Sequence, residues 1–415
     1  MMYNLHELGR AAVTPYRLAA EAHVGLLRHP YNPLSYTPAW RVVSAALDVF
    51  EHTTRPYGKP DFNLPAASID GRTVAVTEEV VERRPFGQLR HFIREGASPN
   101  DPRVLVVAPH SGHYATLLRG TVEALLPGHD VYITEWRDGR MAPLAEGAFS
   151  LDDYIDYVIA FLHYFGPGTH VLAVCQPAVP VLCAVALMAA DKDPCQPRSM
   201  TLMGGPIDTR INPTVPNNLA KEHSIEWFQK SVIQRVPVIY PGFMREVYPG
   251  YIQLTGFMQM NLDRHVGAHI ELFNHLVRGD GDEADDRKAF YEEYRAVMDL
   301  PAEYYLQTVR QVFQEHQLPR GLFVSRGRKV EPAAIAGTAL MTVEGERDDI
   351  SGVGQTRAAH DLCTALPDSM RAHYEQPGVG HYGVFNGRRW KSEIAPRVAA
   401  FMKKHDKARR PGKAA

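Results

Sequence analysis

The sequence predicts an α/β fold in which helices flank a mostly parallel sheet. Short continuous apolar runs recur along the chain, and most are followed by a segment of helical length. Such runs are typical of strands buried on both faces, and regular alternation of strand and helix indicates a parallel sheet. The predicted strands lie at 104–109, 130–134, 170–175, 199–205, 337–344 and 371–374.

Helices are predicted between these strands. Ser150 is an expected N-cap with Asp152 and Asp153 in the first helical turn, and a Gly-Pro-Gly sequence from Gly166 ends that helix. Pro177 and Pro180 open a very apolar helix, since proline is tolerated in a first turn. The expected helices span 115–126, 151–165, 178–190, 356–365 and 394–404.

Three further regions depart from this alternation. Residues 1–58 predict a helical N-terminal extension, which is followed by a hairpin of strands around 62–69 and 72–82 that turns at Asp70-Gly71. Strong strand patterns are missing from 206–335, so this region is expected to be a helical cap inserted into a core of 59–205 and 336–406. Residues 407–415 are a basic tail.

Composition excludes several classes of function. The 415 residues carry 45 Lys+Arg and 47 Asp+Glu, a net charge of −2, which argues against a nucleic-acid binder. No apolar run is long enough to span a bilayer, and no signal-peptide pattern opens the chain. The four cysteines form no C-x-x-C pair, so a reducing, cytoplasmic compartment is expected.

Cys175 is the first candidate for chemistry, because it stands where an apolar strand meets a helix. In α/β-hydrolases such a turn lifts a nucleophile above the sheet, and the N–H of the next residue, here Gln176, helps to bind an oxyanion. Ala173 and Pro177 replace the glycines of the usual G-x-S-x-G pattern, so a buried thiol at a strand end stays an alternative. Ser111, in the loop after the first core strand, is the expected second oxyanion donor.

An acid and a histidine follow in the order that these hydrolases use. Asp348 and Asp349 both come just after an apolar strand and could orient a histidine. His381 lies in a glycine-rich loop after the last strand. His265 and His269 are spaced as i and i+4 but lack the glutamate of the H-E-x-x-H zinc signature, so no metal is expected.

At these positions the sequence resembles the intracellular polyhydroxyalkanoate (poly-3-hydroxybutyrate) depolymerases of bacteria, over nearly its whole length. The segments that carry the resemblance are 108–114, 174–177, 203–208 with 212–214, 345–350 with 354–356, and 378–383. The resemblance implies an α/β-hydrolase fold with a triad of Cys175, Asp348 and His381. Asp348 is preferred to Asp349 because it is the third residue after Gly345, as in related hydrolase acid turns.

The resemblance also implies hydrolysis of a storage polyester at the surface of cytoplasmic granules, without a cofactor. The oligomeric state is left open, with a homo-oligomer as one alternative. The alternatives are a polyhydroxyalkanoate synthase, whose G-x-C-x-G pattern is absent, a non-catalytic granule-binding protein, and a hydrolase of small esters or thioesters. Aromatic and methionine side chains of the cap are expected either to form a helical core or to line an apolar groove: Trp227, Phe228, Tyr240, Phe243, Met244, Tyr248, Tyr251, Phe257, Met258 and Met260.

Overall fold

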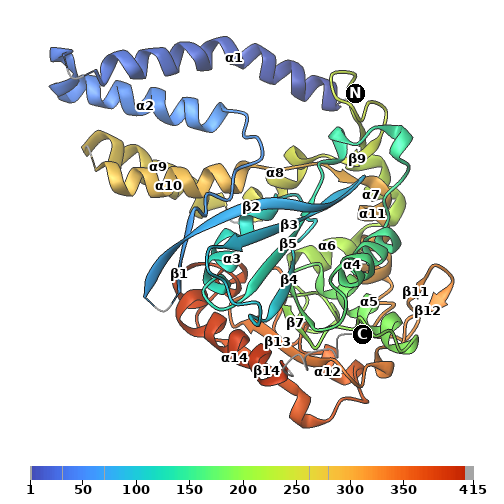
Figure 1. Cartoon of the computed structure of the whole chain (residues 1–415). Helices are drawn as coiled ribbons and strands as arrows, with labels where there is room; N and C mark the ends of the chain where they lie inside the picture. Colours follow the sequence, from blue (N-terminus) through green and yellow to red (C-terminus); the bar gives the residue numbers. More distant parts are fainter. Residues whose placement is uncertain (1, 30, 70, 261, 279, 407–415) are drawn as a thin grey trace.

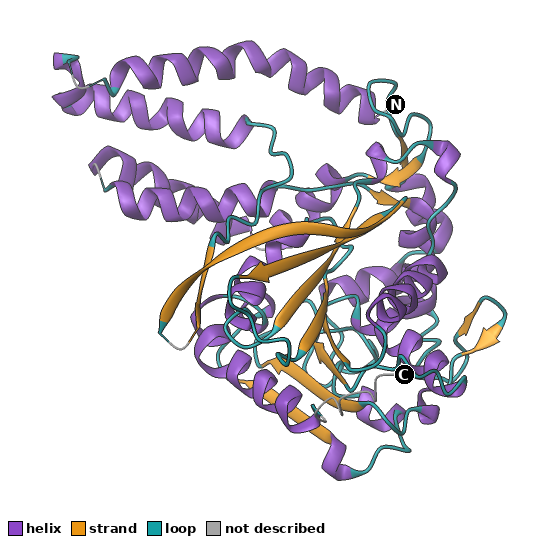
Figure 2. Ribbon diagram, in the orientation of Figure 1, coloured by secondary structure: helices purple, strands orange, loops and turns teal. Residues whose placement is uncertain are grey.

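A nine-stranded sheet runs through the centre of the molecule (Figures 1 and 2). The structure is a computed structural model that describes residues 2–29, 31–69, 71–260, 262–278 and 280–406. In sheet order the strands are β1 (Ala66–Ile69), β2 (Arg72–Arg84), β3 (Gly87–Arg94), β5 (Asp130–Trp136), β4 (Arg103–Val107), β6 (Thr169–Val174), β7 (Ser199–Met203), β13 (Ala339–Gly345) and β14 (Arg371–Gln376). The six strands from β5 to β14 pair in parallel, whereas β3 pairs antiparallel with both its neighbours. This order confirms the predicted α/β-hydrolase fold.

Alternate residues of the central strands enter two separate cores, one on each face of the sheet. On β4, Leu105 and Val107 face one core, and Val104 and Val106 face the other. Helices α4 (Leu151–Phe165) and α5 (Ala178–Ala190) cover the first face, and α3 (Arg119–Leu125) and α14 (Ala395–His405) cover the second. Both faces are therefore dry, which explains why these strands read as continuous apolar runs in the sequence.

The core helices begin and end close to their predicted positions. Helix α4 is capped as expected, because the Ser150 side chain accepts from the N–H of Asp153 and the Asp153 carboxylate accepts from the N–H of Ser150. The predicted helix at 115–126 is instead a 3₁₀ turn (Ala115–Leu118) followed by α3. The core helices are α3 (Arg119–Leu125), α4 (Leu151–Phe165), α5 (Ala178–Ala190), α12 (Ala359–Leu362), α13 (Gly387–Arg389) and α14 (Ala395–His405).

Two further helical regions pack beside the sheet and its covering helices, one at the start of the chain and one inserted between β7 and β13. The chain opens with α1 (Met2–Leu27) and α2 (Pro38–Thr54), which pair as a protruding arm next to α9 and α10 (Figure 1). The inserted helices are α6 (Val215–Glu222), α7 (Ile225–Ser231), α8 (Gly250–Met260), α9 (Leu262–Arg278), α10 (Gly281–Arg295) and α11 (Ala302–Thr308). The insertion also holds short strands: β8 (Gln234–Arg235), β9 (Glu246–Tyr248), β10 (Leu300–Pro301), β11 (Val324–Ser325) and β12 (Arg328–Lys329).

Some expectations need correction or fall outside the described residues. Strand β3 has no counterpart in the prediction, and β1 begins at Ala66 rather than near residue 62. Asp70 of the expected turn and the basic tail at 407–415 lie outside the described residues. The division of the chain into extension, core, cap and tail stays a prediction.

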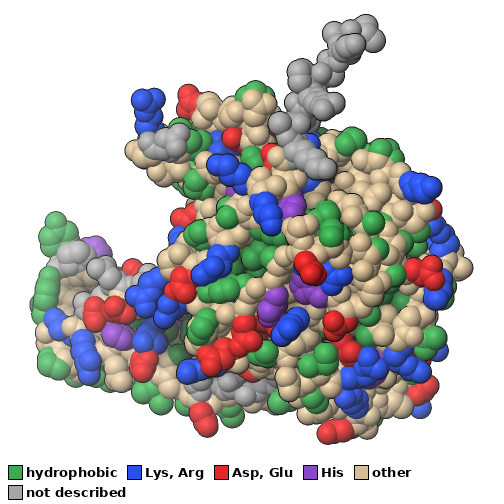
Figure 3. Space-filling model, turned by 90° about the horizontal axis from the view of Figure 1, so that it is seen from below, with side chains coloured by type: hydrophobic (Ala, Val, Ile, Leu, Met, Phe, Trp, Pro, Cys, Tyr) green, Lys and Arg blue, Asp and Glu red, His purple; other side chains and the backbone are tan. Residues whose placement is uncertain are grey.

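The surface adds two observations. None of the described helices is long and apolar enough to cross a membrane. Figure 3 shows acidic and basic side chains interspersed over the face seen from below. That face therefore presents no field of a single sign.

The capping box of α4 gives a stability prediction. Replacing Ser150→Ala leaves an N–H of the first turn without its side-chain acceptor, which costs about 1 kcal/mol. Urea denaturation of the full chain measures this change in the free energy of unfolding. Ser392→Ala, at an exposed serine within a helix, is the control and should change stability by less than about 0.5 kcal/mol. Equal effects of the two substitutions would contradict the role of the cap.

Candidate active site

Cys175 occupies a strained turn between β6 and α5. Its φ of 68° is in the left-handed region, which costs a non-glycine residue about 1–3 kcal/mol. The turn is held because the N–H of Cys175 donates to the carbonyl of Met203 at 2.7 Å and its own carbonyl accepts from the N–H of Ala178 at 3.1 Å. The thiol therefore stands at the carboxyl edge of the sheet, half-buried.

Two glycines at the end of β7 make room for this turn. A Cβ on Gly205 would overlap the Cβ of Ala178 and lie 2.9 Å from the carbonyl oxygen of Cys175. A Cβ on Gly204 would lie 3.2 Å from Cε1 of His381 and 3.3 Å from Oδ2 of Asp348. The close packing that the turn needs is thus supplied by the neighbouring strand, rather than by glycines at positions 173 and 177.

Asp348 and His381 form a buried pair. Nδ1 of His381 lies 2.8 Å from Oδ2 of Asp348, and the other carboxylate oxygen accepts from the N–H groups of Ile350 and Ser351 at 2.9 and 2.8 Å. The side chains are 4% and 0% exposed, so they are shielded from water. Asp349, the alternative acid, is exposed.

The environment of His381 favours its charged form. Burial alone would lower the pKa of His381, but the charges of Asp348 and of a Cys175 thiolate, together with hydrogen bonds to both side chains, raise the pKa well above its usual value. The structure therefore pairs His381 with Asp348 and places Cys175 close enough for its charge to act on the imidazole. The assignment of these three side chains as nucleophile, base and acid stays a prediction.

The two expected oxyanion donors have free backbone groups. Within the described part of the chain, neither the N–H of Ser111 nor that of Gln176 has an acceptor. The loop that carries Ser111 is fixed at its start, because the carbonyl of Ala108 accepts from Nε1 of Trp136 at 2.8 Å and from the hydroxyl of Tyr154 at 2.9 Å. The oxyanion role of Ser111 and Gln176 stays a prediction.

His110, in the same loop, is buried rather than reactive. It lies among the rings of Trp136, Phe149 and Tyr304, and neither of its ring nitrogens has a partner among the described residues. Burial lowers its pKa to about 3, so the imidazole stays neutral. It supports the Ser111 loop as an aromatic core residue.

Sequence analysis missed two groups that hold the acid loop. The buried carboxylate of Glu344 accepts from the N–H groups of Gly354, Thr356 and Arg357 at 2.7–2.9 Å. The hydroxyl of Thr356 lies 2.8 Å from the nitrogen and 3.0 Å from the oxygen of Gly205. The available signal was a glutamate at the end of an apolar strand, a position where burial without a partner would be costly.

A cavity of about 580 Å³ opens beside His381. The core contributes Ile350, Tyr382 and Gly383, and α8–α10 contribute an aromatic wall. Of the cap residues singled out in the sequence, Phe257 lines this cavity, whereas Trp227, Phe243 and Met244 are exposed. The other wall residues went unrecognised because they come from α9 and α10: His265, Ala268, Phe290, Tyr291 and Tyr294.

The histidines considered as metal ligands have other partners. Nδ1 of His265 lies 3.0 Å from the hydroxyl of Tyr291, and Nδ1 of His269 lies 2.7 Å from the carbonyl oxygen of His265. Within the described ranges, one cluster has ligand-like spacing, formed by His163, Asp193 and Cys195. It lies where α4 ends and before β7 begins, at the opposite edge of the sheet from Cys175.

The glycine contact at the turn predicts a large effect of a single methyl group. Gly205→Ala should lower the stability by about 1–3 kcal/mol, because the backbone must move to relieve the overlap, and it should reduce ester hydrolysis by displacing Cys175. Thermal unfolding and turnover of a soluble ester measure the two effects. Gly337→Ala, where a Cβ meets nothing within 4 Å, should leave both unchanged. Wild-type stability in the Gly205 variant would contradict this reading.

The Asp348–His381 pair predicts a pH-dependent contribution to stability. The folded pKa of His381 is raised, so the stabilisation is fully present below about pH 6.5, the unfolded value, and is lost as the pH rises through the folded pKa. Asp348→Asn keeps an oxygen for the N–H groups of Ile350 and Ser351 but removes the charge. The loss of unfolding free energy on substitution should be larger at pH 6 than at pH 10. NMR should also show a lower His381 pKa in the variant, and a loss that grows with pH would refute the assignment.

A known family matches the segment of the chain that holds Asp348 and His381. Residues 204–406 match the family model described as PHB de-polymerase C-terminus. Comparison with curated protein sequences gives no match.

Solved structures of similar shape include a monoacylglycerol lipase from Paleococcus ferrophilus, with 10% identity, a TM-score of 0.45 and coverage of 80% of this chain and 99% of that one. A thermophilic esterase from Thermogutta terrifontis has 11% identity, a TM-score of 0.41 and coverage of 83% and 98%. A 2-hydroxy-6-oxo-6-phenylhexa-2,4-dienoate hydrolase from Rhodococcus has 11% identity, a TM-score of 0.44 and coverage of 80% and 99%. The segment matched by the family model includes Asp348 and His381. In this segment, just under half of its length, the chain is similar to the PHB depolymerase family.

Proposed function

We propose that this protein hydrolyses the ester bonds of amorphous poly(3-hydroxybutyrate) in storage granules, with Cys175 as nucleophile, His381 as general base and acid, and Asp348 as the group that orients the imidazole. The observation that carries the proposal is the buried His381–Asp348 pair beside a cysteine that is held in a left-handed turn. In this proposal the reaction needs no cofactor and takes place at the surface of cytoplasmic granules.

The chemistry proceeds through a thioester. Nδ1 of His381 is bound to Asp348, so Nε2 takes the thiol proton, and the thiolate that remains attacks the ester carbonyl. The N–H groups of Gln176 and Ser111 stabilise the oxyanion. The C–O bond breaks, and the leaving alcohol takes the proton from His381. Water, deprotonated by His381, then attacks the thioester and releases the hydroxyacid and the thiol.

The walls of the cavity suit a chain of esters. Phe257, Phe290, Tyr291 and Tyr294 offer rings to the methyl groups of a polyester, which carries no charge along its length. In this proposal the inserted region 206–335 is a cap over the site. Residues 59–205 with 336–406 form the hydrolase core, and residues 1–58 are an extension.

The test replaces the nucleophile. Cys175→Ala should abolish acid release from amorphous poly(3-hydroxybutyrate), and wild type should show a mass increase of one acyl group after rapid quenching. Cys195→Ala, at a half-buried cysteine outside the site, is the matched control and should keep wild-type turnover. Full activity of the Cys175 variant would refute the proposal.

The same preparation separates the alternatives. Growth of polymer with release of CoA from hydroxybutyryl-CoA would identify a synthase. Turnover of small esters or thioesters without polymer hydrolysis would identify a different hydrolase. Binding of polymer without any acyl adduct at Cys175 would identify a non-catalytic protein.

A further inference from the structure

Helix α1 presents an unusual outer face. At about 100° per residue, Leu8, Ala12, Ala19 and Leu26 fall within an arc of about 40° along the helix. All four are exposed, Leu8 by 65% and Leu26 by 66%. Three more large apolar side chains of α1 extend this exposed surface to either side: Leu5, Tyr16 and Leu18.

The charged residues of α1 lie on the other side of the helix. Arg17 pairs with Glu51 of α2 at 3.3 Å, and Arg10 pairs with Glu7 on α1 itself at 3.2 Å. Arg17 also lies 3.7 Å from Glu21, the one acidic residue of the helix that is exposed. A helix on the surface of a soluble domain normally turns its charges to water and its apolar stripe to the core. Helix α1 instead exposes an apolar arc, while Arg17 and Glu7 on its other side are partly buried.

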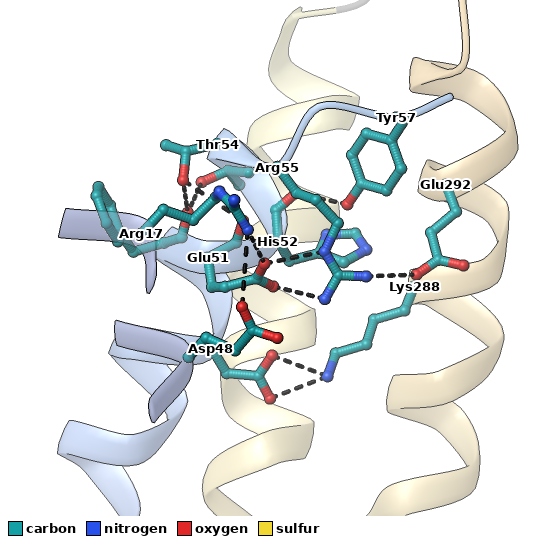
Figure 4. A network of polar contacts seen from close by, with 12 residues as sticks. Arg17, Asp48, Glu51, His52, Thr54, Arg55, Tyr57, Lys288 and Glu292 are labelled. Atoms are coloured by element: carbon teal, nitrogen blue, oxygen red, sulfur yellow. Dashed lines mark hydrogen bonds and ion pairs between the residues drawn. The ribbon is translucent and has the colours of Figure 1, made fainter. Parts of the chain in front are cut away.

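The arm that carries this face is fixed to the rest of the molecule. Figure 4 shows Asp48 and Glu51 of α2 at the centre of an ion-pair network. Asp48 bonds to Lys288 of α10 at 2.9 Å, and Glu51 to Arg55 at 2.8 Å. Arg55 in turn lies 3.6 Å from Glu292 of α10. Since α10 also forms a wall of the cavity at His381, the arm is held in a set position relative to the site.

A second apolar feature lies between the arm and the helices that border the site. A groove of about 580 Å³ runs between α2 and α9, lined by Ala46 and Val49 on one side and by Leu262, Val266 and Ile270 on the other. His265 lines both this groove and the cavity beside His381. Exposed apolar groups on α1 and α9 thus lie on one assembly of helices that reaches the site.

The lack of charge on the outer face limits what can cover it. Nucleic acid or an anionic membrane would call for a row of Lys and Arg, and the exposed arc of α1 has none. A water-insoluble polyester is uncharged and apolar. We propose that the outer face of α1 is a docking surface for solid polyester, which positions the cap helices and the site against the polymer. This inference rests on the proposed function for its choice of partner.

The experiment compares binding to amorphous poly(3-hydroxybutyrate) particles with hydrolysis of soluble p-nitrophenyl butyrate, using the full-length chain. Leu8→Glu combined with Leu26→Glu should weaken co-sedimentation with the particles at least tenfold and slow polymer hydrolysis at limiting particle concentration. Turnover of the soluble ester should stay within twofold of wild type. Wild-type binding should persist in 1 M NaCl, because it uses no ion pairs.

Two further variants keep the result interpretable. Ala12→Glu combined with Ala19→Glu adds charge to the same arc without removing a large side chain and should also weaken binding. Leu144→Glu combined with Leu322→Glu, at residues exposed by 54% and 52% elsewhere, is the matched control and should bind as wild type does. Circular dichroism verifies that each variant is folded.

Three outcomes would overturn the inference. One is unchanged particle binding by both α1 variants, and another is equal loss in the control. The third is a wild-type dimer that the α1 substitutions dissociate without affecting particle binding, which would assign the face to a second copy of the chain. If particles bind through α1 but no polymer is hydrolysed, the proposed function fails while the docking surface stands.

Discussion

The close contact between the end of β7 and the turn at Cys175 is the constraint on which the site depends. Gly205 leaves no space for a Cβ and Gly204 leaves little, so the Cys175 turn, His381 and Asp348 approach one strand end from two directions. The hydroxyl of Thr356 fastens the backbone of Gly205 from the acid-loop side. Because the core behind is dry on both faces of the sheet, a shift at this point cannot be absorbed by small movements elsewhere.

Two buried carboxylates are the second constraint on the site. Asp348 is shielded from water but accepts from two N–H groups and bonds to His381, so its negative charge is compensated at every oxygen. Glu344 is buried in the same way against three N–H groups of the following loop. The two carboxylates fix the loop after β13 from both ends, and that loop sets the position of the imidazole.

Much of this could be predicted from sequence, for identifiable reasons. Strands buried on both faces appear as apolar runs, and α4 carries its own cap in Ser150 and Asp153. Strand β3 was missed because its polar residues are satisfied across the sheet, as in the pair of Arg90 with Glu135 at 3.1 Å. The cavity wall from α9 and α10 was missed because it depends on how distant helices pack, which no local pattern encodes. The sequence shows the glycines at 204 and 205, but it does not show which atoms pack against them.

The exposed leucines of α1 cost free energy, and the ion pairs between α1 and α2 explain why the helix is oriented in this way. Exposed leucines on α1 lose the hydrophobic stabilisation that burial would give, roughly 1.5–3 kcal/mol for each large side chain. The helix instead directs Arg17 inward to the buried Glu51, which a core-facing leucine could not compensate. Glu51 of α2 thus holds Arg17 on the inner side of α1, opposite the exposed leucines. The ion pairs to Lys288 and Glu292 extend that arrangement to α10, so the same charges that turn the apolar face outward also tie it to the wall of the site.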